Sequence, residues 1–135
     1  MTSSTEFGTI LIADDDSDIR EMLSYILERH HMHVVGAADG TQALARARDT
    51  ADLVLVLLDL RMPGLSGAEV IEEMRHDPAL AKIPVVVLSG DRSARDTARS
   101  LGAAGCLAKP FEVSELMREV HRFVPETPDQ PVSVG

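Results

Sequence analysis

Four places in the 135-residue sequence put polar side chains directly after short apolar runs. The aspartates 14–16 follow TILIA, and Asp59 follows LVLVLL. The pair Ser89-Gly90 follows PVVVL, and Lys109 follows GCLA. If these runs are parallel strands, their carboxyl ends meet at one edge of the sheet, where ligands bind. The spacing therefore predicts a crevice in which carboxylates, a hydroxyl group and an ammonium group face one another.

This combination of groups is suited to phosphoryl transfer. Clustered carboxylates repel one another and resist ionising together unless a cation joins them. Hard oxygen ligands at a strand-end crevice suit Mg²⁺, with Mn²⁺ as the alternative metal. A carboxylate beside such a cation can act as a nucleophile toward phosphorus and form an aspartyl phosphate. Lys109 and Ser89 would then hold the phosphoryl oxygens, one as a charge and one by a hydrogen bond.

Five short apolar runs, most of them rich in β-branched residues, predict the strands that position these groups. Such runs are typical of strands that are buried on both faces of a sheet. The fifth run is the weakest. The expected strands are Thr9–Ala13, Val34–Ala37, Leu53–Leu58, Pro84–Leu88 and Gly105–Ala108.

The segments between these runs have the spacing of amphipathic helices. The first follows a Ser/Asp start, and the third opens on a Ser66/Glu69 capping-box pattern. The last begins at Glu112 or Ser114 and is expected to turn Val113 inward. The expected apolar stripes or ranges are Ile19–Met22–Leu23–Ile26–Leu27, Thr41–Arg48, Val70–Ile71–Met74, Arg92–Leu101 and Val113–Leu116–Val120–Phe123.

Strict alternation of strands and helices predicts an α/β fold with a doubly wound, five-stranded parallel sheet. We expect the flavodoxin-like (βα)5 arrangement with strand order 2-1-3-4-5. The predicted organisation is an N-terminal tail at 1–8, one domain at 9–124, and a Pro-rich disordered tail or linker at 125–135. Three of the seven prolines fall in this last segment.

Composition narrows the class of protein further. The chain has 22 acidic and 13 basic residues, a formal net charge of −9, which argues against direct binding of nucleic acid. A single Cys and the lack of a signal peptide or an apolar membrane span favour a cytoplasmic protein without membrane contact. Residues 1–77 hold 15 acids and 6 bases, and residues 78–135 hold 7 of each, so the negative charge lies in the first part.

Four motifs in this order and spacing make the sequence similar to the receiver domain of bacterial two-component response regulators. They are ILIADDDSDIR, LVLLDLRMPGLSG, VVVLSG and AKPF, and the similarity covers about residues 8–124. The resemblance implies a phosphorylation-dependent switch that assists its own phosphorylation and dephosphorylation but is not otherwise an enzyme. Its phosphoryl donor would be a sensor histidine kinase or a histidine phosphotransfer protein.

The same resemblance assigns roles to individual residues. Asp59 matches the phosphoacceptor, Asp15 a direct Mg²⁺ ligand, and Asp14 a ligand acting through water. The backbone carbonyl of Arg61 matches the family's main-chain metal ligand.

The later motifs match the parts of the family that sense the phosphoryl group. Ser89 matches the switch hydroxyl and Lys109 the phosphate-binding lysine, followed by a cis bond to Pro110. The surface of the last two helices and the fifth strand would change on phosphorylation and control an unidentified downstream protein. The chain would act as a monomer or as a phosphorylation-dependent homodimer.

Two positions depart from the family pattern. The family often places Tyr or Phe three residues before the lysine, where this chain has Cys106, so we expect activation to pass mainly through Ser89, Gly90 and the fourth loop. The pair Ser89-Gly90 replaces the commoner hydroxyl-Ala pair and should loosen that loop.

Two charged residues are predicted at the mouth of the crevice. Arg61 lies two residues after Asp59, and Asp91 lies two residues after Ser89. Their side chains are placed to pair across the opening, where they would hinder an attacking water molecule. An exposed pair of this kind contributes only about 0–1 kcal/mol, so the effect should be modest.

Two other classes of protein fit the sequence less well. An aspartyl-phosphate phosphatase of the haloacid-dehalogenase type wants a second Asp two residues after the nucleophile, where this chain has Arg61. A flavodoxin-like binding module wants a phosphate loop and aromatic stacking residues, which the crevice lacks. The arginines 92, 95 and 99 share one helical face, which fits a partner surface and an ordinary solvated face equally well.

Overall fold

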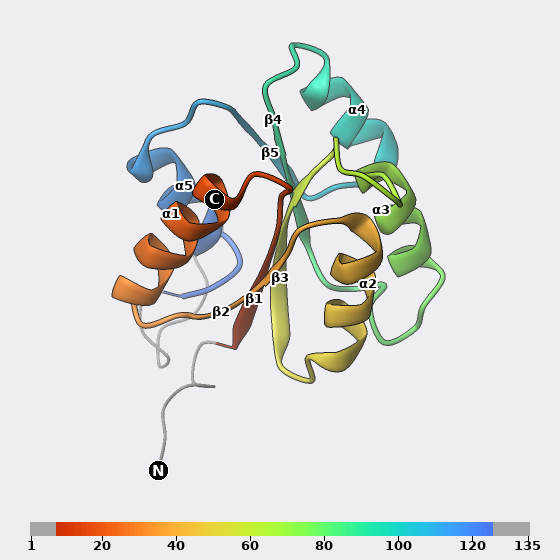
Figure 1. Cartoon of the computed structure of the whole chain (residues 1–135), viewed down its shortest axis with the longest axis horizontal. Coiled ribbons are helices and arrows are strands. Elements are labelled where there is room, and N and C mark those ends of the chain that lie inside the picture. Colours follow the sequence, from red (N-terminus) through yellow and green to blue (C-terminus); the bar gives the residue numbers. More distant parts are fainter. Residues whose placement is uncertain (1–7, 126–135) are drawn as a thin grey trace.

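The computed structural model describes residues 8–125, which form a five-stranded parallel sheet with helices on both faces (Figure 1). The strand order is β2-β1-β3-β4-β5, as the sequence predicts. β5 and β2 are therefore the edge strands. The strands are β1 (Thr9–Ala13), β2 (His33–Ala37), β3 (Leu53–Asp59), β4 (Val85–Ser89) and β5 (Gly105–Ala108).

The helices divide into two layers that bury the central strands between them. In Figure 1, α1 and α5 cover one face of the sheet, and α2, α3 and α4 cover the other. Each face has its own apolar cluster, built from alternate side chains of the same strands: Leu55 and Leu57 face α1 and α5, whereas Val56 and Leu58 face the other layer. The helices are α1 (Ser17–Arg29), α2 (Gly40–Asp49), α3 (Gly67–Arg75), α4 (Ala94–Leu101) and α5 (Val113–His121).

Polar side chains at the helix N-termini fix where several helices begin. Asp16 accepts hydrogen bonds from the N–H groups of Asp18 and Ile19 and so caps α1. Ser66 and Glu69 form the predicted capping box at α3. In each case the polar residue at the end of the loop caps the helix that follows.

Burial differs from expectation on the edges and at two helix positions. β2 is not buried on both faces, because it is an edge strand and only Ala37 within it is buried. Met22 on α1 and Val113 on α5 were expected to point inward, but they are 45% and 51% exposed. Val113 is the first residue of its helix, before the buried face of α5 begins at Leu116.

Two helix ends also differ from the pattern. The fourth helix was expected from residue 92 but begins at Ala94, because residues 91–93 form a turn closed by the Asp91 side chain. The last helix ends at His121, two residues before Phe123.

The predicted tails at 1–8 and 125–135 lie outside the described residues, except for Gly8 and Pro125. Their boundaries stay predictions. No helix within residues 8–125 combines the length and apolar character that a membrane crossing requires.

Candidate functional site

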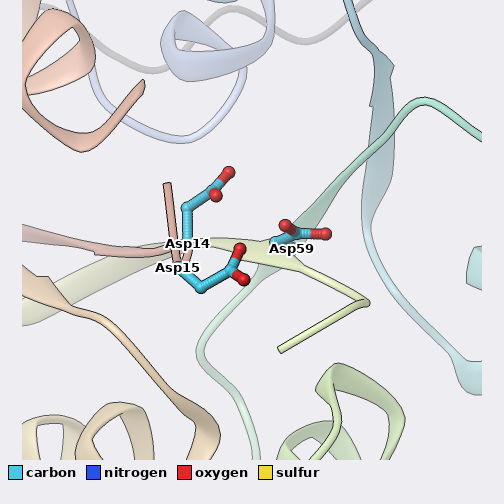
Figure 2. Close-up of side chains that lie close together, drawn as sticks. All are labelled: Asp14, Asp15 and Asp59. Atoms are coloured by element: carbon cyan, nitrogen blue, oxygen red, sulfur yellow. The ribbon is translucent and has the colours of Figure 1, made fainter. Parts of the chain in front are cut away.

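Three carboxylates meet where β1 and β3 end, as the sequence predicts (Figure 2). Asp14 is fully buried, Asp59 is 7% exposed, and Asp15 faces solvent. One oxygen from each of the three lies within 4.8 Å of the others. The parallel pairing of β1 with β3 brings them together, since it sets Ala13 beside Leu58, one residue before each acidic position.

Lys109 brings positive charge to this cluster from the end of β5. Its Nζ lies 2.7 Å from Oδ2 of Asp14 and 3.3 Å from Oδ2 of Asp59, and so it bridges two strand ends. The backbone N–H of Lys109 donates to the carbonyl of Ser89, which holds the lysine against the end of β4. The peptide bond from Lys109 to Pro110 is cis, as the resemblance implies.

The environment of Asp59 works in two directions on its pKa. Burial raises the pKa of the Asp59 carboxyl above its usual value, and the negative charge of Asp14 acts in the same sense. The N–H of Arg61, which donates to Oδ1 of Asp59 at 3.0 Å, and the charge of Lys109 partly offset this. The net result is that the Asp59 carboxyl group loses its proton less readily than a solvated aspartic acid does.

The lysine is affected in the opposite way by the same cluster. Burial alone would lower the pKa of Lys109, but its hydrogen bond and ion pair with Asp14 and the charge of Asp59 raise that pKa above its usual value. Lys109 is therefore a permanent cation at neutral pH. Its charge is available to any anion that approaches Asp59.

A chain of contacts connects the mouth of the site to the start of α4. Ser89 is buried at the end of β4, and its Oγ accepts a hydrogen bond from the N–H of Asp91 at 3.1 Å. The Asp91 carboxylate accepts from the N–H and the hydroxyl of Ser93 at 3.1 and 3.0 Å, and the backbone donor lowers the pKa of Asp91. The same carboxylate pairs with the Arg61 guanidinium at 3.0 Å, which is the contact that the spacing predicts.

Two of the predicted switch positions lie apart from the carboxylates. Gly90 follows Ser89 at the surface, and a Cβ there would meet no atom closer than the carbonyl oxygen of Lys109 at 4.0 Å. Sterics therefore do not require a glycine at this position. Cys106 lies within β5, half-buried, and burial raises the pKa of its thiol, which disfavours the reactive thiolate.

The three carboxylates suit a hard divalent cation. They offer only oxygen donors, and within residues 8–125 the exposed Asp15 carboxylate makes no hydrogen bond or ion pair, so it is available as a ligand. The Arg61 backbone lies beside them, because its N–H contacts Asp59. The donor set fits Mg²⁺ or Mn²⁺.

Sequence reasoning missed several supporting contacts. Arg20 on α1 donates from Nη1 to the carbonyl of Asp14 at 2.7 Å, and this bond holds the acidic loop against the helix. No sequence pattern predicts this contact. The turn at Ser93 had a signal, since an Asp two residues before a Ser commonly closes such a turn. At the other end of β1, Thr9 donates to Asp52 at 2.9 Å, a contact between distant residues with no local signature.

Comparison with known proteins gives consistent matches over most of the chain. The family model described as the response regulator receiver domain matches residues 10–121. The DNA-binding response regulator MtrA of Mycobacterium tuberculosis is 34% identical over 127 residues, which are 93% of this chain and 54% of MtrA. The chain spans about half the length of the curated relatives it matches.

Solved structures give the same family of folds. The chemotaxis protein CheY4 of Vibrio cholerae superimposes with a TM-score of 0.79 at 29% identity, covering 87% of this chain and 98% of CheY4. The receiver domain of the sensor histidine kinase PA1611 from Pseudomonas aeruginosa also gives 0.79, at 27% identity, covering 86% of this chain and 96% of its own. That structure holds a magnesium ion coordinated in its active site cleft.

Proposed function

The chain belongs to the response regulator receiver domain family, the phosphorylation-dependent switches of two-component signalling, and on that premise we propose that Asp59 is its phosphoacceptor. The observation that carries the proposal is the position of Asp59 at the end of β3, between the acidic pair of β1 and the Lys109 cation. A sensor histidine kinase or a histidine phosphotransfer protein supplies the phosphoryl group from a phosphohistidine.

The proposed reaction uses groups that already surround Asp59. One carboxylate oxygen of Asp59 attacks phosphorus, a P–O bond forms, and the P–N bond of phosphohistidine breaks so that the imidazole leaves. The Nζ of Lys109 lies 3.3 Å from Oδ2 of Asp59 and forms an ion pair with a phosphoryl oxygen of the product. The buried Ser89 hydroxyl donates a hydrogen bond to a second phosphoryl oxygen.

A divalent cation has a place in the same proposal. Asp15 and Asp59 would hold Mg²⁺ directly, with the carbonyl of Arg61, and Asp14 would act through water. The magnesium ion in the PA1611 receiver domain supports this choice. When bound, the ion neutralises the carboxylates and the phosphoryl oxygens, which otherwise repel one another.

The contacts around Asp91 support a route from the phosphoryl group to α4. In the structure the Ser89 Oγ accepts from the N–H of Asp91, and Asp91 also closes the turn that starts α4. If Ser89 reorients toward the phosphoryl group, the N–H of Asp91 loses its partner and the turn at 91–93 can rearrange. Activation would then reach the α4–β5–α5 surface without an aromatic residue at position 106.

Phosphorylation can be tested directly on the purified chain. Incubation with acetyl phosphate and Mg²⁺ should add one phosphoryl group to the wild type and none to Asp59→Ala, as measured by intact mass. Asp49→Ala, which removes an acidic residue at the end of α2, is the matched control and should be labelled like the wild type. Labelling that survives in Asp59→Ala would place the acceptor elsewhere.

The route through α4 has its own readout. Amide chemical shifts of residues 91–108 should change on phosphorylation of the wild type. They should change much less in Asp91→Ala, whereas Asp96→Ala, which removes an acid within α4 itself, should behave like the wild type. Shift changes confined to the carboxylate cluster in the wild type would contradict the route.

The relatives' names describe two different outputs, DNA binding for MtrA and chemotaxis for CheY4. We therefore assign this chain the switch and leave its downstream partner to be identified by binding. The sequence-based expectations of a cytoplasmic location and of a monomer or phosphorylation-dependent homodimer remain part of the proposal.

A further inference from the structure

A hollow of about 280 Å³ lies between α4, β5 and α5, away from the carboxylate cluster. Small residues line much of it: three alanines, Gly105 and Cys106. Among these, Ala98 is buried and Cys106 is half-buried. Because no large side chain projects from this part of β5, the space remains open at the edge of the sheet.

The charged residues that line the hollow are mostly basic. The basic residues are Arg95 and Arg99 on α4 and Arg122 after α5, and the acidic residue is Glu119. This differs from the molecule as a whole, which carries a net charge of −9. The hollow is thus a local positive site on an acidic protein.

The single acid is already neutralised by one of the arginines. Glu119 accepts from Nη1 of Arg122 at 2.8 Å, and Arg122 also stacks on the Phe123 ring, 5.0 Å from its centre. Gly105 makes room for this pair, since a Cβ there would lie 2.6 Å from Oε1 of Glu119. By contrast, within residues 8–125 neither Arg95 nor Arg99 has an acidic partner or a side-chain hydrogen bond.

We propose that this hollow binds an acidic segment of a partner protein, with carboxylates held by Arg95 and Arg99 and a neighbouring side chain seated against Cys106. The inference names the partner chemistry of the proposed α4–β5–α5 output surface and rests on that proposed function. The two unpaired arginines supply the charge complementarity, and the small residues between them supply the space.

The size and setting of the hollow favour a protein segment over other anions. At about 280 Å³ it falls at the lower limit of small-molecule sites, which usually range over about 300–1,000 Å³, and so it suits one or two side chains. Nucleic acid requires phosphate contacts spread along a basic surface, whereas this chain is strongly acidic overall. An acidic peptide needs only the local pair of arginines.

The experiment is a titration of the ¹⁵N-labelled full chain with an acetylated peptide of alternating Glu and Leu, five residues long. Its counterpart, in which Gln replaces each Glu, is the control ligand. We expect the acidic peptide to shift the amide signals of Ala98, Gly105 and Cys106, and the Gln peptide to leave them in place. Binding should weaken between low and high NaCl concentration, since exposed charges are screened.

Three variants distinguish the contribution of the arginine charges to peptide binding from that of the open space beside Cys106. Arg95→Gln combined with Arg99→Gln should weaken binding by up to about thirtyfold, given at most about 1 kcal/mol for each of two exposed ion pairs. Arg92→Gln is the matched control, because this arginine precedes α4 and does not line the hollow. Cys106→Tyr should reduce binding by filling the space without changing the charge. The arginine variants change exposed residues, so they test the proposal even if the tyrosine variant folds poorly.

Several outcomes would overturn the inference. They are equal shifts with both peptides, an equal loss in Arg92→Gln, stronger binding of a DNA duplex than of the acidic peptide, and concentration-dependent shifts without peptide, which would indicate a second copy of the chain. Failure of the phosphoryl switch is distinguishable, because acetyl phosphate labelling of Asp59 is measured in the same preparation. A chain that is labelled normally and binds no acidic peptide refutes the docking site alone.

Discussion

Asp59 combines two properties that pull in opposite directions, a buried position and a negative charge. Burial and Asp14 raise its pKa, and Lys109 and the Arg61 N–H only partly compensate. The folded chain therefore binds a proton at Asp59 more tightly than the unfolded chain does. This contribution to stability is fully present below the unfolded pKa, near 3.8, and is lost as the pH rises through the raised folded value.

It follows that Asp59→Asn should stabilise the chain at pH 7 in the absence of metal. The expected gain is about 1 kcal/mol, the usual size of a single-substitution effect, and it should shrink as the pH falls below about 4. Urea unfolding of both proteins at pH 7 and pH 3.5 measures it. Asp91→Asn is the control, because the hydrogen bond from Ser93 lowers the pKa of Asp91 and its replacement should bring no gain. A less stable Asp59→Asn at pH 7 would contradict this account.

The pair of Arg61 and Asp91 is expected to slow hydrolysis of the phosphorylated protein. The two side chains are 82% and 41% exposed, so their interaction is worth no more than about 1 kcal/mol, and loss of it should speed decay by at most about fivefold. The test is the decay rate of the phosphoprotein for Arg61→Ala, which keeps the backbone carbonyl. Arg46→Ala on α2 should decay like the wild type, and an unchanged rate in Arg61→Ala would remove this role.

The elements differ in how tightly the backbone of one packs against another. At the start of α2, Gly40 donates its N–H to the carbonyl of Pro63, and a Cβ at Gly40 would overlap the backbone of Leu65. This contact ties α2 to the loop that follows Asp59. Nothing in the sequence pattern identifies it, since Gly40 reads simply as a helix start.

Gly40→Ala should therefore destabilise the fold by about 1–3 kcal/mol, as overpacking does. Gly36→Ala is a matched control in β2, where a Cβ would meet its nearest atom at 3.8 Å, and it should be neutral or slightly stabilising. Denaturant unfolding of the two variants measures the difference. Equal free energies of unfolding for the two variants would contradict this account, because they would mean that the loop after Asp59 moves aside at little cost.

The strands and the site could be predicted from the sequence for one physical reason. Apolar runs followed by Asp59 or Lys109 carry both the strand and the polar residue at its end, and parallel pairing then brings those ends together. What could not be predicted depends on contacts between distant residues. Three features depend on how the helices and strands pack once they have formed. They are the exposure of Met22, the turn that makes α4 begin only at Ala94, and the hollow beside Cys106.

Charge across the whole molecule is uneven, and part of it is concentrated at one point. Residues 1–77 carry the entire net charge of −9, and three of their acids form the cluster at the strand ends. The basic hollow lies in the balanced remainder of the chain. The proposed metal site and the proposed partner site thus have local charges of opposite sign.

Mg²⁺ should raise the melting temperature of the wild type if it binds this cluster. A ligand at 100 times its Kd stabilises the folded state by about 2.7 kcal/mol, which corresponds to several degrees for a domain of this size. NaCl at equal ionic strength is the control for general screening, and Asp15→Asn should lose most of the effect of Mg²⁺. An equal shift with NaCl would mean that the cluster has no specific metal site.

Lys109 also has a consequence for how the protein matures during synthesis. Its partners Asp14 and Asp59 lie 95 and 50 residues earlier in the chain, so the cluster cannot be completed until β5 has been made and has joined the sheet. Until then the nascent chain holds its carboxylates without their internal cation. The carboxylate cluster is therefore completed only after β5 has been synthesised and has paired with β4, whatever follows it in the chain.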